Sequence, residues 1–316
     1  MYLIIAAAAT ILPVVLGQVY SQSNLNHTCL LVPDYQSCTV NANPLTVDSC
    51  CVETYGGLVL ATQFWDTYTG LESSGQVLPK NSWTLHGLWP DFCNGSFTQY
   101  CDLSRQYDPS PSPNTTTGPN GTTVSVPAYT GPGVDTFVQD FGRYDLLAYM
   151  KKYWVSQGSP SAGFWAHEFS KHATCYSTFD VPCYGPKYEQ HEEVIDFFET
   201  AITYFRQLPT YDWLADAGIV PSNTTSYSLH DIQNALRIRF GATPYLGCSG
   251  PKYSAPNSTD HGKTVLSEAW YYHNVLGRPQ DGKSVVLDAS VAGSVSSCSN
   301  ATGAIWYYER GAGSQA

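Results

Sequence analysis

The sequence predicts an α+β fold in a single domain, with several helices packed against a central antiparallel sheet. Segments with helical periodicity gather in the middle of the chain, and segments with strand character flank them on both sides. The ten cysteines run from Cys29 to Cys298 without a gap that would mark a domain boundary. We therefore expect one unit that is held together by five disulfides.

Four segments predict helices: 134–154, 167–175, 188–208 and 228–241. Gly142 interrupts the first segment, which is therefore also compatible with two short helices. The third is amphipathic with acids in its first turns, and Pro209 ends it. The fourth begins at Ser228, has Asp231 at the capping-box position and ends at Gly241.

Five segments rich in β-branched and aromatic residues predict strands: 56–65, 82–89, 263–275, 283–290 and 304–310. Pro, Gly, Thr and Asn dominate residues 108–133, which we expect to form a surface loop because such residues bury little apolar area. The alternative for this segment is a linker between two domains, although cysteines lie on both of its sides.

Residues 1–17 form an uncharged apolar stretch that is shorter than the roughly 20 residues needed to cross a bilayer. It predicts a signal peptide with a cleavage site at Val15-x-Gly17, although no Lys or Arg precedes the apolar residues. The mature domain would span 18–316, and no later stretch is apolar enough to enter a membrane. We expect a secreted protein, with a vacuolar or lysosome-like compartment as the alternative destination.

The cysteines and the sequons both agree with export. An even number of cysteines after an export signal predicts disulfides, and no CxxC pair of the kind that binds zinc is present. Seven Asn-x-Ser/Thr sequons fit passage through a glycosylating pathway. The candidates for glycosylation are Asn26, Asn94, Asn114, Asn120, Asn223, Asn257 and Asn300.

The formal net charge of −11 bears on possible partners. It argues against a protein that holds nucleic acid by broad neutralisation of phosphates with Lys and Arg. A local cationic site is still compatible with this charge. The net charge therefore favours the short-lived complexes of an enzyme with an anionic substrate over tight binding.

Two aromatic segments carry three of the eight histidines: WTLHGLWP at 83–90 and FWAHEFSKHATC at 164–175. In a regular strand, His86 would face one side near the strand end, while Trp83 and Trp89 would face the other. Taken alone, His86 is more often a core residue than a catalyst, and Trp83 is a packing residue. Together with the second segment, however, His86 is better interpreted as part of one site that both segments form.

The second segment places titratable groups on adjacent stripes of one helix. Glu168 and His172 are four residues apart, and so are His167 and Lys171, which makes each pair neighbours. The two histidines lie five residues apart and diverge by about 140°, so HEFSKH does not match the HExxH zinc pattern. We expect no metal site. A solvated, charged helix face is the alternative, but Cys175 and the preceding Phe-Trp pair indicate a partly buried element.

Two histidines with a nearby ammonium group suit in-line phosphoryl transfer. Histidine, with an unperturbed pKa near 6.5, can serve as the base at one position and as the acid at another. Lys171 can stabilise negative charge that grows on the phosphate oxygens. The sequence contains no Walker loop, GxSxG motif or metal-binding acid cluster that would provide a competing mechanism, and none of this chemistry requires a cofactor.

With these motifs in view, the chain resembles the ribonuclease T2 family of secreted acid ribonucleases. WTLHGLWPD is similar to the family's first active-site motif, and FWAHEFSKHATC is similar to the second. Phe169 stands where Trp is commoner, and Ala173 where Gly is commoner. The order of the cysteines, with adjacent Cys50 and Cys51, resembles the fungal branch. The resemblance extends from residue 29 to about 310, with a longer 108–133 loop.

The resemblance implies endonucleolytic cleavage of single-stranded RNA with little base specificity and without metal or cofactor. The 2′-hydroxyl would attack the adjacent phosphate, which leaves a 2′,3′-cyclic phosphate and a free 5′-hydroxyl. His172 would accept the 2′-hydroxyl proton, and His86 would protonate the leaving oxygen. DNA would resist cleavage because it lacks the 2′-hydroxyl, and the enzyme would act as a monomer.

The resemblance also implies roles for the neighbouring residues. Glu168 and Lys171 would stabilise the pentacovalent phosphate, and His167 would bind it. The first base site would contain Trp89, Asp91 and Phe97, where Phe97 lacks the hydroxyl of the commoner Tyr. The second base site would contain Gln63 and Phe164.

The fungal framework implies five specific disulfides, which spacing alone would not select. They are Cys29–Cys51, Cys38–Cys93, Cys50–Cys183, Cys101–Cys175 and Cys248–Cys298. Both histidine segments would then be tethered covalently.

Two other classes of protein compete with the enzyme. A secreted binding or toxin-like protein could keep the fold without catalysis, but the loss of a catalytic histidine that would mark it is not seen. A carbohydrate-binding module would account for the 8 Trp and 23 Tyr residues. That interpretation leaves the His/Glu/Lys helix unexplained.

Overall fold

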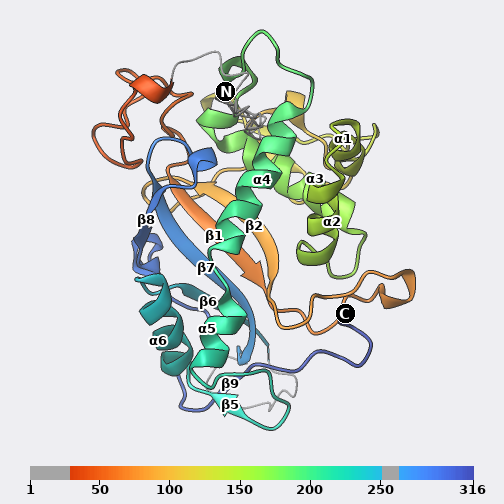
Figure 1. The fold of residues 1–316 in the computed structure, drawn as a ribbon. Helices are drawn as coiled ribbons and strands as arrows, with labels where there is room; N and C mark the ends of the chain where they lie inside the picture. The colour runs from red at the N-terminus through yellow and green to blue at the C-terminus, as the bar shows by residue number, and fades with distance from the viewer. Residues whose placement is uncertain (1–28, 251–262) are drawn as a thin grey trace, which may run out of the picture.

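The computed structural model describes residues 29–250 and 263–316 (Figure 1). The expected signal peptide and the sequons at Asn26 and Asn257 lie outside the described residues. The predicted α+β class is confirmed, since helices pack against one seven-stranded sheet, and a two-stranded sheet lies apart from it. No helix in the described part of the chain is both long and apolar enough to cross a membrane.

The main sheet is built around one long strand. Its strands are β1 (Leu58–Phe64), β2 (Thr84–Asp91), β5 (Ser226–Tyr227), β6 (Tyr245–Ser249), β7 (Val265–Val275), β8 (Ser284–Leu287) and β9 (Ile305–Trp306). The long strand β7 pairs antiparallel with β1, β6 and β8, and β1 pairs antiparallel with β2. The sheet is therefore antiparallel as predicted, except for one parallel bridge between β7 and β9.

Six α-helices are present in the described residues. They are α1 (Val134–Asp140), α2 (Tyr144–Tyr153), α3 (Ser161–Lys171), α4 (Glu192–Arg206), α5 (Thr210–Asp216) and α6 (Leu229–Phe240). Gly142, with φ of 67°, separates α1 from α2, so the expected first helix is two helices. Gly241 ends α6 in the left-handed conformation, as its sequence indicated.

The helices cover one face of the sheet and bury most of the apolar side chains there. In Figure 1, α4 crosses this face, with α1, α2 and α3 beside it and α5 and α6 near the far end of the sheet. Phe197 and Phe198 of α4 pack with Trp154, Trp165 and other aromatic rings in one large core. Only a small apolar cluster around Leu58, Leu60 and Tyr272 covers the opposite face. The opposite face of the sheet therefore has room for polar side chains.

Residues 108–133 lie mostly at the surface, as expected, but the segment is not irregular throughout and is anchored at two positions. The segment contains a hairpin of β3 (Thr115–Thr117) and β4 (Thr123–Ser125). It is tied into the fold at Asp108, its first residue, and at Val126, just after the hairpin, since both are buried. Composition alone did not show this, because a few anchoring side chains hold a segment that otherwise buries little area.

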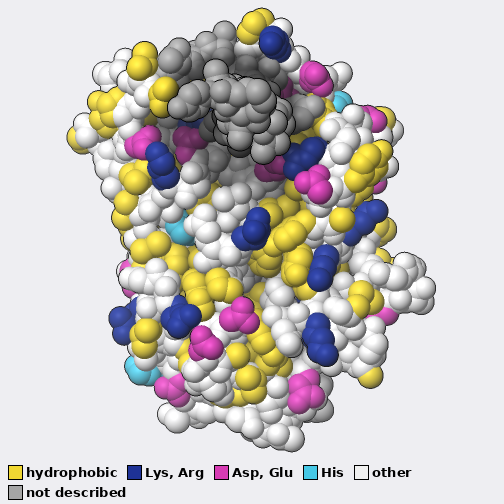
Figure 2. All heavy atoms as spheres, in the orientation of Figure 1, with side chains coloured by type: hydrophobic (Ala, Val, Ile, Leu, Met, Phe, Trp, Pro, Cys, Tyr) yellow, Lys and Arg dark blue, Asp and Glu magenta, His cyan; other side chains and the backbone are white. Residues whose placement is uncertain are grey.

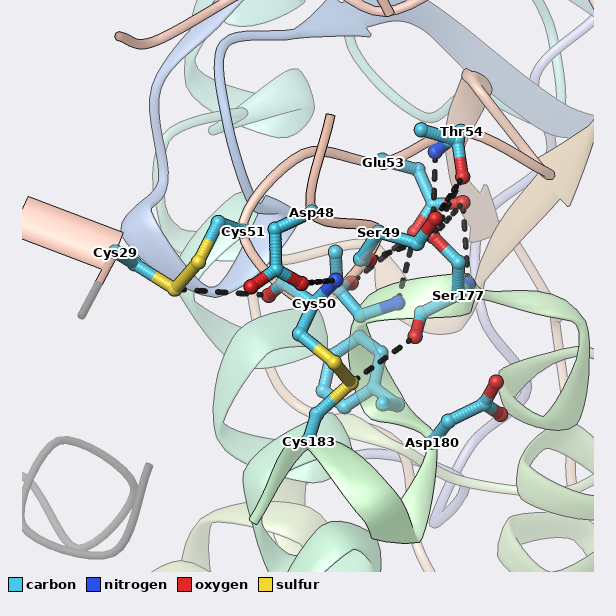
Figure 3. The surroundings of a disulfide bond; sticks show 12 residues. Cys29, Asp48, Ser49, Cys50, Cys51, Glu53, Thr54, Ser177, Asp180 and Cys183 are labelled. Carbon is cyan, nitrogen blue, oxygen red and sulfur yellow. Dashed lines mark hydrogen bonds between the residues drawn. A yellow bond between two sulfur atoms is a disulfide. The ribbon is translucent and has the colours of Figure 1, made fainter. Parts of the chain in front are cut away.

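All ten cysteines are paired, and the five disulfides are the ones that the resemblance implied. Figure 3 shows how Cys29–Cys51 and Cys50–Cys183 meet at the adjacent cysteines. Beside them the buried Glu53 carboxylate accepts hydrogen bonds from the backbone N–H groups of Ser177 and Thr178. This joins the beginning of the chain to the segment that follows the second histidine motif.

Candidate active site

A β-bulge in β2 sets the direction of the first motif. Thr62 of β1 pairs with Gly87, whereas the next residue, Gln63, pairs with Leu85, so His86 is the extra residue. The bulge brings His86 and Trp89 to the same face, with their rings edge-on and 4.6 Å apart between centroids. The expectation that these two side chains face opposite ways is therefore wrong. Trp83 is buried in the core, as predicted.

Gly87 allows α3 to approach the bulge closely. A Cβ at this position would lie 2.0 Å from Oε2 of Glu168 and 2.6 Å from Nε1 of Trp89. Any side chain here would therefore displace the glutamate. The absence of a side chain at residue 87 is a condition for the geometry of the site.

The Glu168 carboxylate lies between the two histidines. Its Oε2 accepts a hydrogen bond of 2.8 Å from the indole N–H of Trp89. Its Oε1 lies 3.6 Å from Nε2 of His86, and its Oε2 lies 4.0 Å from Nε2 of His172. The Trp89 ring also stacks on His172 with a centroid distance of 4.9 Å. Strand β2 and the C-terminal end of α3 thus assemble one cluster from both motifs.

His167 has a different partner from the one that the helix spacing indicated. Its Nδ1 lies 2.8 Å from Oδ2 of Asp108, which also accepts a hydrogen bond of 3.0 Å from the Tyr100 hydroxyl. Sequence reasoning missed Asp108 and Tyr100. Asp108 was hidden as the first residue of the Pro-rich segment, and nothing in the sequence singled out Tyr100. Lys171, the last residue of α3, has no ion-pair partner among the described residues.

Burial and neighbouring cations control the titration of the cluster. Burial lowers the pKa of His86 well below 6.5, and the charges of His167 and Lys171 lower it further. The pKa of His172 falls for the same reasons. Burial raises the pKa of Glu168 to about 7, although the cations and the Trp89 N–H oppose this. Near neutral pH, His86, His172 and Glu168 therefore share few bound protons among them. Groups that gain and lose protons in this pH range suit an acid–base site.

Comparison with known proteins identifies the family of the chain. Residues 56–286 match the model of the Ribonuclease T2 family. The chain belongs to the ribonuclease T2 family. Ribonuclease Trv of Hypocrea rufa is 42% identical over 251 residues, which cover 79% of this chain and 87% of that protein. Ribonuclease T2 of Aspergillus oryzae is 36% identical, over 76% of this chain and 72% of its own length.

Solved structures give the same result. Actibind, described as a T2 ribonuclease, superposes with a TM-score of 0.67 at 33% identity, over 88% of this chain and 96% of its own. RNase NT shares the fold at a TM-score of 0.50 and 17% identity, over 81% of this chain and 98% of its own. The chain spans about half the length of the ribonuclease T2-like proteins of Emericella nidulans and Candida albicans. By family, then, this protein is a ribonuclease.

Of the residues expected at the first base site, Trp89 and Asp91 lie on β2 with His86, and Phe97 lies in the loop that follows. Trp89 is held between His86 and His172, so its indole forms a wall of the site. The carboxylate of Asp91, two residues further along β2, accepts no hydrogen bond from the described residues, and burial raises its pKa to about 7. Phe97 is 73% exposed in the loop beyond Cys93.

At the expected second base site, Gln63 does not face the catalytic cluster. Its side chain is 1% exposed, donates to the carbonyl of Leu208 and accepts from the hydroxyl of Thr210 on the core side of the sheet. The next residue, Phe64, points to the other face and stacks on His86 at a centroid distance of 3.7 Å. Phe164 of α3 lies nearby as expected, 5.7 Å from the His86 ring. The sequence-based choice was one residue away from the one that faces the site.

Proposed function

We propose that this protein is a secreted endoribonuclease of low base specificity that cleaves single-stranded RNA by transesterification to 2′,3′-cyclic phosphate ends. The observation that carries the proposal is the Glu168 carboxylate between His86 and His172. An acid and a base on either side of one position are what an in-line displacement at phosphorus needs. No metal is required, because the phosphate oxygens can be stabilised by side chains.

In this reaction His172 accepts the proton of the 2′-hydroxyl as O2′ forms its bond to phosphorus. The bond from phosphorus to O5′ then breaks, and His86 gives a proton to the leaving oxygen. Lys171 stabilises the charge on the equatorial oxygens, and His167, oriented by Asp108, binds the phosphate. Glu168 stabilises whichever imidazole is protonated and, when it is itself protonated, can donate to a phosphate oxygen.

The distribution of charge fits a transient encounter with a single strand. On the helix-covered face drawn in Figure 2, Lys and Arg side chains are dispersed among Asp and Glu side chains. Trp89, Asp91 and Phe97 would receive the base on one side of the phosphate, and Phe64 and Phe164 the base on the other. DNA would stay intact, because it lacks the attacking 2′-hydroxyl. We further propose a monomer with a cleaved signal peptide over 1–17.

The direct test is cleavage of homopolymer RNA at pH 4–7 in the presence of EDTA. The wild type should produce cyclic phosphate ends, and His86→Ala and His172→Ala should each lose about 1,000-fold or more in rate. His230→Ala is the matched control, because His230 is exposed on α6 and should leave the rate unchanged. Full activity of His172→Ala, or loss of wild-type activity to the chelator, would contradict the mechanism.

A further inference from the structure

A pocket of about 600 Å³ adjoins the catalytic cluster on one side. Phe64 and Phe164 form the part of its wall nearest to the cluster, and Asp66 and Glu268 are also in the wall. Phe64 stacks on His86, whereas neither His172 nor Trp89 lines the pocket. The pocket thus lies on the side of His86.

This inference rests on the function proposed above. Under that function, the position of the pocket determines which nucleotide it can bind. If His86 protonates the leaving O5′, the nucleoside that departs lies beside His86. The base of that nucleoside, on the 3′ side of the cleaved bond, is the one that can reach the pocket. Phe64 and Phe164 offer ring faces against which a base can stack.

Two carboxylates of the pocket wall come from β7 and from the segment just after β1. Glu268 pairs with Phe64 in the register of β1 and β7, so its side chain leaves the sheet on the same face. Asp66 follows β1, and its carboxylate accepts no hydrogen bond from the part of the chain that the structure describes. Arg310, the nearby cation, donates to the backbone carbonyls of Asp66, Pro79 and Ser82 instead.

Two carboxylates next to an RNA backbone repel its phosphates. Hydrogen bonds that the carboxylates accept from the bound base would offset this repulsion. Burial raises the pKa of Asp66 to about 6, with a further rise from Glu268 and an opposing effect of Arg310, so Asp66 is mostly an acceptor at pH 7. Guanine presents N1–H and N2–H side by side, a pair of donors that matches one carboxylate. Uracil places carbonyl oxygens on both sides of its single N–H. Adenine and cytosine place an acceptor beside their amino group.

We propose that Asp66 and Glu268, in the wall of this second base site, make it select guanine on the 3′ side of the cleaved bond. The enzyme would then accept many bases on the 5′ side of the bond and still discriminate on the 3′ side. Asp66 and Glu268 are specificity residues in this proposal, and the proton transfers do not involve them.

The test compares kcat/KM for ApG and ApU at pH 7. The wild type should prefer ApG, and Asp66→Asn and Glu268→Gln should each reduce the ApG/ApU ratio by about tenfold. Glu309→Gln is the matched control, because Glu309 is an exposed carboxylate next to Tyr308 but outside the pocket wall. Hydrolysis of adenosine 2′,3′-cyclic phosphate, which has no 3′ base, should be the same in all four proteins and reports that each variant is folded.

Each result has one meaning. A wild type that cleaves ApU as fast as ApG overturns the selection of guanine, and so does a ratio that is unchanged in both pocket variants. If cyclic phosphate hydrolysis persists in either case, the proposed ribonuclease function stands without the inference. If the wild type cleaves neither dinucleotide nor cyclic phosphate, the proposed function fails and the inference fails with it.

Discussion

At the scale of single residues, Glu168 is the group on which the site depends. It is 1% exposed, and its carboxylate touches the Trp89 indole and approaches both catalytic candidates, His86 and His172. A buried carboxylate near two imidazoles favours their protonated forms, while burial opposes every charge in the cluster. Its main effect should therefore be on the pH range in which one histidine is protonated and the other is not.

Replacing Glu168 with Gln tests this directly. The neutral amide cannot stabilise an imidazolium, so the pKa of His86 should fall further. The basic limb of the kcat/KM profile, where the acid loses its proton, should move to lower pH by about one to three units. Glu189→Gln, at an exposed site, should leave the profile unchanged. A basic limb that stays in place in Glu168→Gln would exclude this role for the carboxylate.

The Asp108 carboxyl leads to a second prediction, which concerns the free energy of unfolding. Burial acts to raise its pKa, but hydrogen bonds from His167, Ser110 and Tyr100 hold it below the ordinary value of 3.8. A lowered carboxyl pKa stabilises the fold above the pKa of the unfolded chain, and this contribution is lost as the pH falls through the lower folded value. Asp108→Asn should therefore cost about 1.5–3 kcal/mol at pH 7 and less near pH 3. Denaturant unfolding at both pH values measures this, and an equal loss at both would contradict it.

At the scale of elements, strand β2 shows where sequence reasoning succeeded and where it failed. The strand was predicted from β-branched and aromatic content, the role of His86 from its combination with the second histidine segment, and the role of Trp89 from the family resemblance. The direction of Trp89 was not, because one extra residue at His86 breaks the alternation on which that prediction relied. Gly87, a glycine inside a strand, is the residue that could have indicated the bulge. Gln63 was assigned from the family resemblance; its side chain turns to the core, and its neighbour Phe64 faces the site instead.

Two glycine-to-alanine substitutions separate site geometry from backbone effects. Gly87→Ala places a methyl group against Glu168 and should reduce kcat by about 100-fold, because it displaces the carboxylate. Gly163→Ala, in α3, meets only Cγ of Pro109 at 4.0 Å. It should keep full activity and gain about 0.5–1 kcal/mol of stability from better helix propensity. Activity assays and denaturant unfolding test both, and an active Gly87→Ala would show that close approach at the bulge is not needed.

At the scale of the whole molecule, the site joins segments that are distant in the chain, and disulfides fix them. Cys38–Cys93 lies just after the first motif, and Cys101–Cys175 closes the second. The number of disulfides was predicted from the even cysteine count and the predicted signal peptide, but the pairing came only from the family resemblance. The buried end of the 108–133 segment could not be foreseen, since its partner His167 is 59 residues away.

The Cys101–Cys175 disulfide should matter more for activity than its stability contribution implies. Beside it, Tyr100 donates its backbone N–H to the carbonyl of Lys171, so this corner positions both the end of α3 and the Tyr100–Asp108 contact. Its two cysteines are 74 residues apart, and those of Cys248–Cys298 are 50 apart. Chain entropy then gives both bonds a similar contribution, about 4 kcal/mol each.

Changing both cysteines of each pair to Ser distinguishes position from stability. The two double variants should show a similar loss of free energy of unfolding. Well below their unfolding temperatures, the variant without Cys101–Cys175 should lose about tenfold or more in the rate of cyclic phosphate hydrolysis, because small displacements of α3 misalign His172. The variant without Cys248–Cys298 should stay close to wild type. Equal rates in the two folded variants would mean that the packing of α3 alone holds the catalytic geometry.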